Sequence, residues 1–79
     1  SLDELSGSGT ILIYPNPTSN MLNIDTRLDI EVEIYDMVGK LVVSKVNSKR
    51  LDLSPLTNGL YNLIIIHEEK RYSKQIVKQ

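Results

Sequence analysis

Asn58-Gly59-Leu60-Tyr61-Asn62-Leu63-Ile64-Ile65-Ile66 is the stretch that decides the fold of this chain. Leu, Ile and Tyr suit a buried, pleated surface, and a run this short between a glycine and charged residues favours a strand over a helix. Asn58 and Gly59 tolerate positive φ angles, so they predict a turn just before the strand. We therefore expect a central β-strand over residues 60–66.

The segment before this strand predicts a corner. Residues 51–56 alternate and are then interrupted by Pro55. A strand, a Pro/Gly corner and a tyrosine two residues into the next strand form the layout of a tyrosine corner, in which the hydroxyl binds upstream backbone. Tyr61 is the candidate. An ordinary half-buried tyrosine is an equally good interpretation of the same pattern.

Short strand patterns separated by turn signals fill the rest of the chain. Residues 30–35 show the clearest period of two, with three apolar side chains facing inward and Glu31 and Glu33 facing water. The other strands are expected at residues 11–14, 21–25, 40–45, 50–53 and 71–77. This spacing predicts an all-β domain, an immunoglobulin-like antiparallel β-sandwich of about seven short strands.

Two turns contain residues that fix the local backbone geometry. In the hairpin at residues 36–39, Asp36 caps the turn through its side chain and Gly39 takes a left-handed conformation. Pro15 and Pro17 end the strand at residues 11–14 and push the residues before them into extended geometry. That strand is therefore expected at a sheet edge, or to switch sheets at the prolines.

The expected central strand has a second apolar face, opposite the one that packs on the core. If Tyr61, Leu63 and Ile65 face the core, the residues that face outward include Leu60, Ile64 and Ile66. Such a strip is either covered by a neighbouring loop or is a contact surface, and covering is the favoured interpretation.

Composition limits the chain to one small domain. It has 79 residues, no cysteine and a net charge of −1, which excludes a strongly basic nucleic-acid surface. Residues 1–10 predict a flexible linker because of Ser6, Gly7, Ser8 and Gly9, and residues 11–79 predict the folded domain. No transmembrane segment or signal peptide is present in the sequence, and the chain begins with serine, so we expect a piece of a longer or processed protein.

No catalytic constellation is visible. There is no cysteine nucleophile, and the single histidine, His67, is interpreted as a solvated turn residue. Glu31 and Glu33 are interpreted as a solvated face and not as paired catalytic carboxylates. Potential metal ligands are dispersed, and no phosphate-binding glycine loop occurs. We predict that the domain is not an enzyme and has no metal or cofactor.

Four motifs in order nevertheless form a recognisable set. They are Tyr14–Pro17, Ile34–Val42, Leu53–Tyr61 and Lys74–Gln79. Together they resemble the type A C-terminal sorting domain of the type IX (Por) secretion system, over residues 11–79. The final Lys-Gln, in place of the more common single terminal Lys or Arg, is a small departure.

The resemblance implies a function and a set of partners. Such domains have a seven-stranded immunoglobulin-like fold and follow a fused N-terminal cargo in Gram-negative bacteria. The cargo crosses the periplasm, passes the outer-membrane type IX translocon, and is released or anchored at the cell surface after a sortase-like surface protease removes the domain. The domain itself is not an enzyme.

Roles for individual residues follow from this resemblance. The last strand is the expected recognition element, because an edge strand presents unpaired backbone and alternating side chains. Its residues are Lys74, Gln75, Ile76, Val77, Lys78 and Gln79. Cleavage is expected in the flexible linker at Ser6, Gly7, Ser8 and Gly9. Residues assigned to the fold are Tyr14, Pro15, Asn16, Pro17, Asp36, Gly39, Lys40, Gly59 and Tyr61.

A second hypothesis is a non-catalytic accessory module of a secreted enzyme, either a spacer or a carbohydrate-binding domain. Sugar binding by such modules uses exposed aromatic side chains or a shaped groove. The four tyrosines of this chain supply such a platform poorly.

Overall fold

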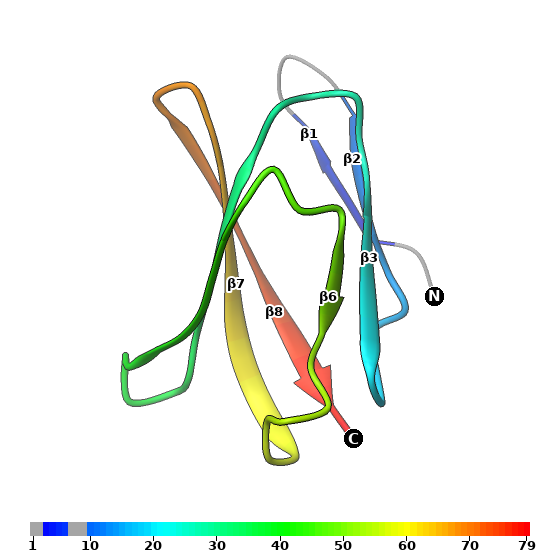
Figure 1. Cartoon of the computed structure of the whole chain (residues 1–79), viewed down its shortest axis with the longest axis vertical. Coiled ribbons are helices and arrows are strands. Elements are labelled where there is room, and N and C mark those ends of the chain that lie inside the picture. The colour runs from blue at the N-terminus through cyan, green and yellow to red at the C-terminus, as the bar shows by residue number, and fades with distance from the viewer. Residues whose placement is uncertain (1–2, 7–9) are drawn as a thin grey trace.

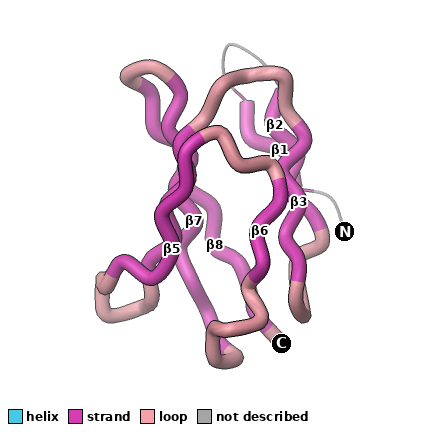
Figure 2. Tube along the Cα trace, in the orientation of Figure 1, coloured by secondary structure: helices cyan, strands magenta, loops and turns pink. Residues whose placement is uncertain are grey.

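The computed structural model describes residues 3–6 and 10–79, and this part of the chain contains eight β-strands and no helix. The strands form two facing layers, with the loops gathered at the two ends (Figures 1 and 2). They are β1 (Asp3–Ser6), β2 (Thr10–Tyr14), β3 (Met21–Asp25), β4 (Glu31–Tyr35), β5 (Leu41–Val46), β6 (Arg50–Asp52), β7 (Gly59–His67) and β8 (Lys70–Lys78).

Each layer is a four-stranded antiparallel sheet. One sheet has the order β1-β2-β3-β6, and the other has the order β5-β4-β7-β8. The strand that follows Asn58, β7, lies inside its sheet between β4 and β8. The prediction of an all-β, immunoglobulin-like sandwich is confirmed, and the predicted strands form to within one residue at each end.

The first strand, β1, is not predicted by the sequence. Residues 1–10 are expected as a flexible linker, but Asp3–Ser6 forms an antiparallel ladder with β2. A ladder is held by backbone hydrogen bonds, so a segment without alternating apolar residues can still join the edge of a sheet. Gly7, Ser8 and Gly9, the rest of the predicted cleavage linker, lie outside the described residues.

The core fills the space between the two sheets, and alternation decides which side chains enter it. Val32 and Ile34 of β4 and Leu63 and Ile65 of β7 are fully buried, whereas Glu31 is exposed. Removing one such side chain from water stabilises the fold by about 1.5–3 kcal/mol. The core residues are Ile11, Ile13, Leu22, Ile24, Ile30, Val32, Ile34, Leu51, Leu53, Tyr61, Leu63, Ile65 and Ile76.

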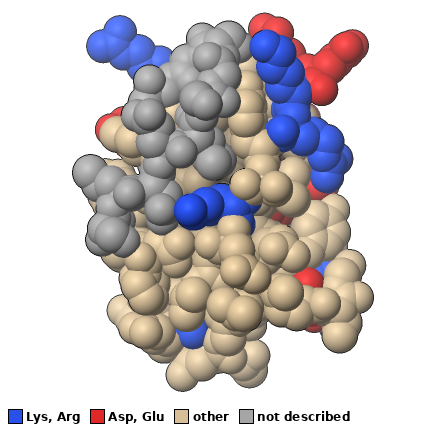
Figure 3. Space-filling model, turned by 180° about the vertical axis from the view of Figure 1, so that it is seen from behind, with Lys and Arg blue, Asp and Glu red and all other residues tan. Residues whose placement is uncertain are grey.

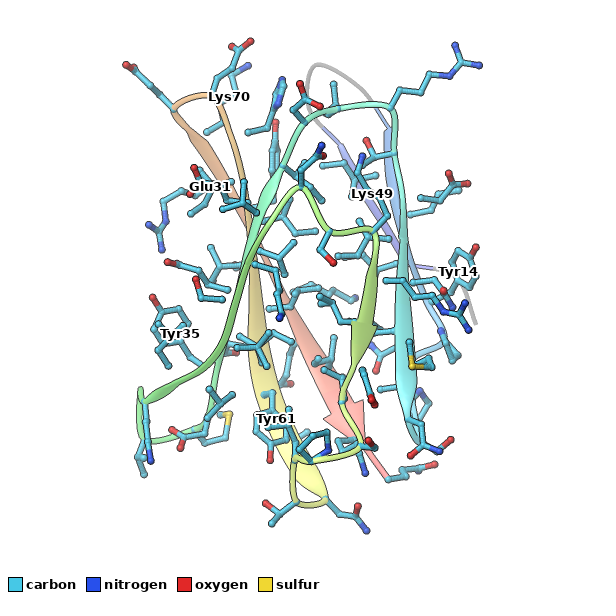
Figure 4. All side chains as sticks on the ribbon, in the orientation of Figure 1. Tyr14, Glu31, Tyr35, Lys49, Tyr61 and Lys70 are labelled. Atoms are coloured by element: carbon cyan, nitrogen blue, oxygen red, sulfur yellow. The ribbon has the colours of Figure 1, made fainter. Side chains whose placement is uncertain are left out.

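Tyr61 forms the predicted tyrosine corner. Its side chain is buried, and its hydroxyl donates a hydrogen bond to the backbone oxygen of Thr57 at 2.7 Å. The same hydroxyl lies 3.2 Å from the Oγ1 atom of Thr57. Figure 4 shows Tyr61 at the lower end of the molecule, beside the loop that joins β6 to β7. Of the two interpretations of this residue, the corner is confirmed.

The outer apolar strip of β7 lies between charged side chains of the two flanking strands. Ile64 and Ile66 are half-buried. A guanidinium nitrogen of Arg71 on β8 lies 3.9 Å from Glu33 Oε1 on β4, so this pair spans the outer face of β7. The Tyr35 hydroxyl donates to the same Glu33 oxygen at 3.0 Å, and this hydrogen bond is the main cause that raises the pKa of Tyr35.

Candidate functional site

The four sequence motifs meet at one end of the sandwich. Because successive strands alternate in direction, the loop after β2, the β4–β5 hairpin, the β6–β7 connection and the end of β8 lie together at the lower end of Figure 2. We call this region the motif end and define it as residues 14–20, 36–40, 53–61 and 74–79. The sequence order of the motifs gives no indication that they converge.

Within the motif end, the proline-containing segment is hydrogen-bonded to the last strand. The Thr18 N–H donates to the Val77 oxygen at 2.9 Å, and the Gln79 N–H donates to the Thr18 oxygen at 2.8 Å, which makes a parallel bridge to β8. Asn16 adds two side-chain hydrogen bonds, from its Nδ2 to the Gln75 oxygen and from the Val77 N–H to its Oδ1. Nothing in the sequence around Thr18 indicates this contact.

The structure also shows where the strand before the prolines lies. β2 lies between β1 and β3, so the expectation of an edge strand is wrong. The other alternative, a switch between sheets at the prolines, is confirmed because Thr18 pairs with β8 of the opposite sheet. The peptide bonds before Pro15 and Pro17 are both cis.

The six residues expected to carry recognition differ in exposure. Gln75 and Gln79 are exposed, and Lys74 and Val77 are half-buried. Ile76 is fully buried in the core. This alternation agrees with a strand that packs one face on the core and turns the other toward solvent.

Lys78, one of these six residues, is a buried charged side chain. It is only 7% exposed, and its Nζ donates to Asn58 Oδ1 at 3.3 Å and to the Gln79 oxygen at 3.2 Å. Lysine is almost never buried without such partners, so local sequence gives no reason to expect it. Lys78 therefore fastens the end of β8 to the turn before β7.

The hairpin and the β6–β7 connection share a shallow hollow at the motif end. Two N–H groups, those of Val38 and Lys40, donate to Asp36 Oδ1 at 3.0 and 2.9 Å, and Gly39 has a φ of 90°, so the predicted capped turn is confirmed. The hollow has a volume of about 390 Å³ and is lined by both loops. Seen from behind, the lower half of the molecule shows few charged side chains (Figure 3).

The carboxyl group of Asp52 gives the motif end a pH-dependent contact. The Ser54 N–H donates to Asp52 Oδ1 at 2.9 Å, and hydrogen bonding from the Ser54 side chain and backbone lowers the pKa of Asp52. A group whose folded-state pKa is lowered contributes stability above its unfolded-state pKa, about 4, and loses it as the pH falls through the folded-state value.

We expect this contact to be visible in a comparison with Asp52→Asn. The wild-type chain should be the more stable protein at about pH 7, and the difference in free energy of unfolding should shrink as the pH falls below about 4. Urea unfolding across this range measures the difference. A difference that stays constant with pH would show that the Asp52 charge does not take part.

The opposite end of the sandwich carries further polar contacts, and these are structural. His67 is not a solvated residue, because its side chain is only 14% exposed and its Nδ1 lies 2.9 Å from the Asp29 oxygen. Lys49, labelled in Figure 4, donates from Nζ to the Thr26 and Leu28 oxygens at 3.1 and 2.7 Å. Both side chains fasten the crossover between β3 and β4.

Residues 3–6 and 10–79 contain no group of three or more His, Cys, Asp or Glu side chains that could hold a metal ion. Within the same residues, no helix has the length and apolar character needed to cross a membrane. Glu31 is exposed, whereas Glu33 contacts Tyr35 and Arg71, so the two carboxylates differ in their surroundings.

Comparison with known proteins identifies the family. The sequence model of one family, described as a secretion system C-terminal sorting domain, matches residues 12–79. The chain belongs to this family. A search among curated proteins finds no match.

The sorting domain is therefore a type IX C-terminal sorting signal. Membership implies a cargo fused on its N-terminal side, the type IX machinery as partner, and secretion to the cell surface or the extracellular space. The family is non-catalytic in general. The matched residues include the whole motif end, from Tyr14 to Gln79.

Proposed function

We propose that the type IX translocon recognises this sorting domain at the motif end, through the outward side chains of the last strand. The observation that carries the proposal is the attachment of β8 to Asn16 and Thr18, which presents Gln75 and Gln79 to solvent on a fixed backbone. The buried Ile76 and Lys78 hold the strand in place.

The route before recognition is part of the proposal. A cargo fused upstream of the domain reaches the translocon from the periplasm of a Gram-negative bacterium. The accessory-module alternative receives less support, because Tyr61 is buried and the other three tyrosines are half-buried.

We further propose that a sortase-like surface protease cleaves the chain within Ser6–Gly9, after which the cargo is released or anchored. A cut there leaves β1 on the cargo side, so β1 must separate from β2 before the cargo is free. Mass spectrometry of the domain recovered after export identifies the new N-terminus. A terminus downstream of Ile11, inside the sandwich, would contradict the proposal.

The recognition proposal is tested by transplanting residues 1–79 behind a periplasm-targeted fluorescent protein in a bacterium with a type IX system. We expect surface or medium fluorescence from the intact fusion and periplasmic retention of a Gln75→Ala/Gln79→Ala variant. Point substitutions are preferable to deletion of residues 74–79, because the deletion removes Ile76 from the core. The double variant changes only exposed side chains, so its thermal stability should stay within about 0.5 kcal/mol of wild type.

A matched control is Glu69→Ala, in the exposed turn between β7 and β8 at the opposite end. We expect export of this control to equal that of the intact fusion. Normal export of the double variant would reject recognition through these side chains. Retention of the intact, folded fusion would reject the sorting function itself.

A further inference from the structure

The outer edge of β8 is covered at Gln75–Gln79 by the proline-containing segment. In an antiparallel strand, alternate residues direct their backbone groups to one side, and the hydrogen bonds at Gln75 and Val77 show that odd-numbered residues face outward. At Gln75–Gln79 this side is occupied by Asn16 and Thr18. The ladder between β2 and β3 ends at the pair Tyr14 and Asn23, and the proline segment that follows Tyr14 leaves this sheet.

Asn16 is well suited to this position because its amide carries both an acceptor and donors, as a peptide group does. Its Oδ1 accepts from the Val77 N–H at 3.1 Å, and its Nδ2 donates to the Gln75 oxygen at 3.2 Å. The side chain therefore replaces one residue of a neighbouring strand. Pro15 and Pro17, on either side, have no N–H group to offer to a further strand.

Thr18 anchors the other half of this contact. Its side chain is 1% exposed, and its Oγ1 donates to the Met21 oxygen at 2.7 Å. The Leu53 N–H donates to the Asn20 oxygen, so the segment is also tied to the end of β6. These bonds fix the Thr18 backbone against Val77 and Gln79.

We propose that Asn16 and Thr18 are positioning residues that cover the outer edge of β8, so that a partner cannot add a strand along Gln75–Gln79 and must recognise side chains there. An uncovered edge strand pairs readily with other chains, and a covered one does not. The cover also fixes the backbone of Gln75 and Val77, from which their side chains project. The part of this inference that concerns export rests on the proposed function, and the part that concerns the edge does not.

Hydrogen exchange of single amides, measured by NMR on the 79-residue chain, tests the cover. In Asn16→Ala, the Val77 amide should exchange roughly tenfold faster than in wild type, because it loses its acceptor. Asn16→Asp retains an acceptor oxygen and should keep most of the protection. Ile76, whose amide faces β7, should be unaffected in both variants.

Asn58→Ala is the matched control. It removes another asparagine contact to the same strand, the bond to Lys78 Nζ, which does not lie on the outer edge. The Val77 amide should therefore exchange at the wild-type rate in this control. An unchanged Val77 rate in Asn16→Ala, or an equal acceleration at Ile76, would overturn the cover.

Export of the fluorescent fusion tests whether the covered edge of β8 is needed for recognition. We expect Asn16→Ala to export severalfold less than wild type at a temperature where both fusions are folded, with Asn16→Asp restoring most of the export. Faster Val77 exchange with normal export would overturn the positioning role in recognition. If the wild-type fusion is itself retained, the proposed function fails, and the exchange result alone decides whether Asn16 covers the edge.

Discussion

Replacement of Ile76 with alanine is expected to lower the free energy of unfolding by about 2–5 kcal/mol. Ile76 is fully buried and pairs across the ladder with Tyr61, so its loss leaves a cavity between the two sheets. A 79-residue domain has a modest total stability, and this change removes a large part of it. Urea unfolding of the purified chain, followed by circular dichroism, measures the loss.

The neighbouring residue supplies the control for this prediction. Gln75 is exposed on the opposite face of the same strand, and Gln75→Ala should change the stability by no more than about 0.5 kcal/mol. Ile76→Val removes a single methylene and should cost about 0.5–1.5 kcal/mol. Equal stabilities of Ile76→Ala and Gln75→Ala would show that β8 does not pack on the core in this register.

The second large effect is expected at the tyrosine corner. Tyr61→Phe keeps the ring in the core but removes the hydroxyl that donates to the Thr57 oxygen at 2.7 Å. The loss of one such hydrogen bond should lower the free energy of unfolding by about 1 kcal/mol. Export should be unchanged, because the side chain is buried and phenylalanine keeps its ring in the same place.

Tyr35→Phe is a suitable comparison for Tyr61→Phe. The Tyr35 hydroxyl also donates one hydrogen bond, to Glu33, but it lies on the outer face of the sheet near the solvent-accessible Arg71. Water can replace this partner, so the loss should be smaller than at Tyr61. Full stability of Tyr61→Phe in thermal unfolding would argue that the corner does not support the fold.

The sequence predicts those parts of the domain that local patterns control. The alternation in β4 and β7 correctly places Val32, Ile34, Leu63 and Ile65 in the core, because a period of two assigns faces directly. The Asp36 turn is predictable for a similar reason, since its hydrogen bonds join residues within four positions of each other.

Contacts between distant segments could not be predicted in this way. The two side-chain bonds of Asn16 reach residues 59 and 61 positions away, and the Thr18 bridge uses only backbone atoms. The burial of Lys78 depends on the position of Asn58, which only the assembled fold provides. β1 has no alternating pattern, and pairs because β2 offers an unpaired backbone.

Because the proline segment binds β8, the fold can be completed only after this last strand has been synthesised. Of the strands described here, β8 is translated last, yet it supplies the core residue Ile76 and the backbone that Asn16 and Thr18 bind. A chain whose translation stops before Ile76 lacks both this core residue and the backbone that Asn16 and Thr18 bind. A finished sandwich is thus a physical sign that the ribosome has completed this part of the message.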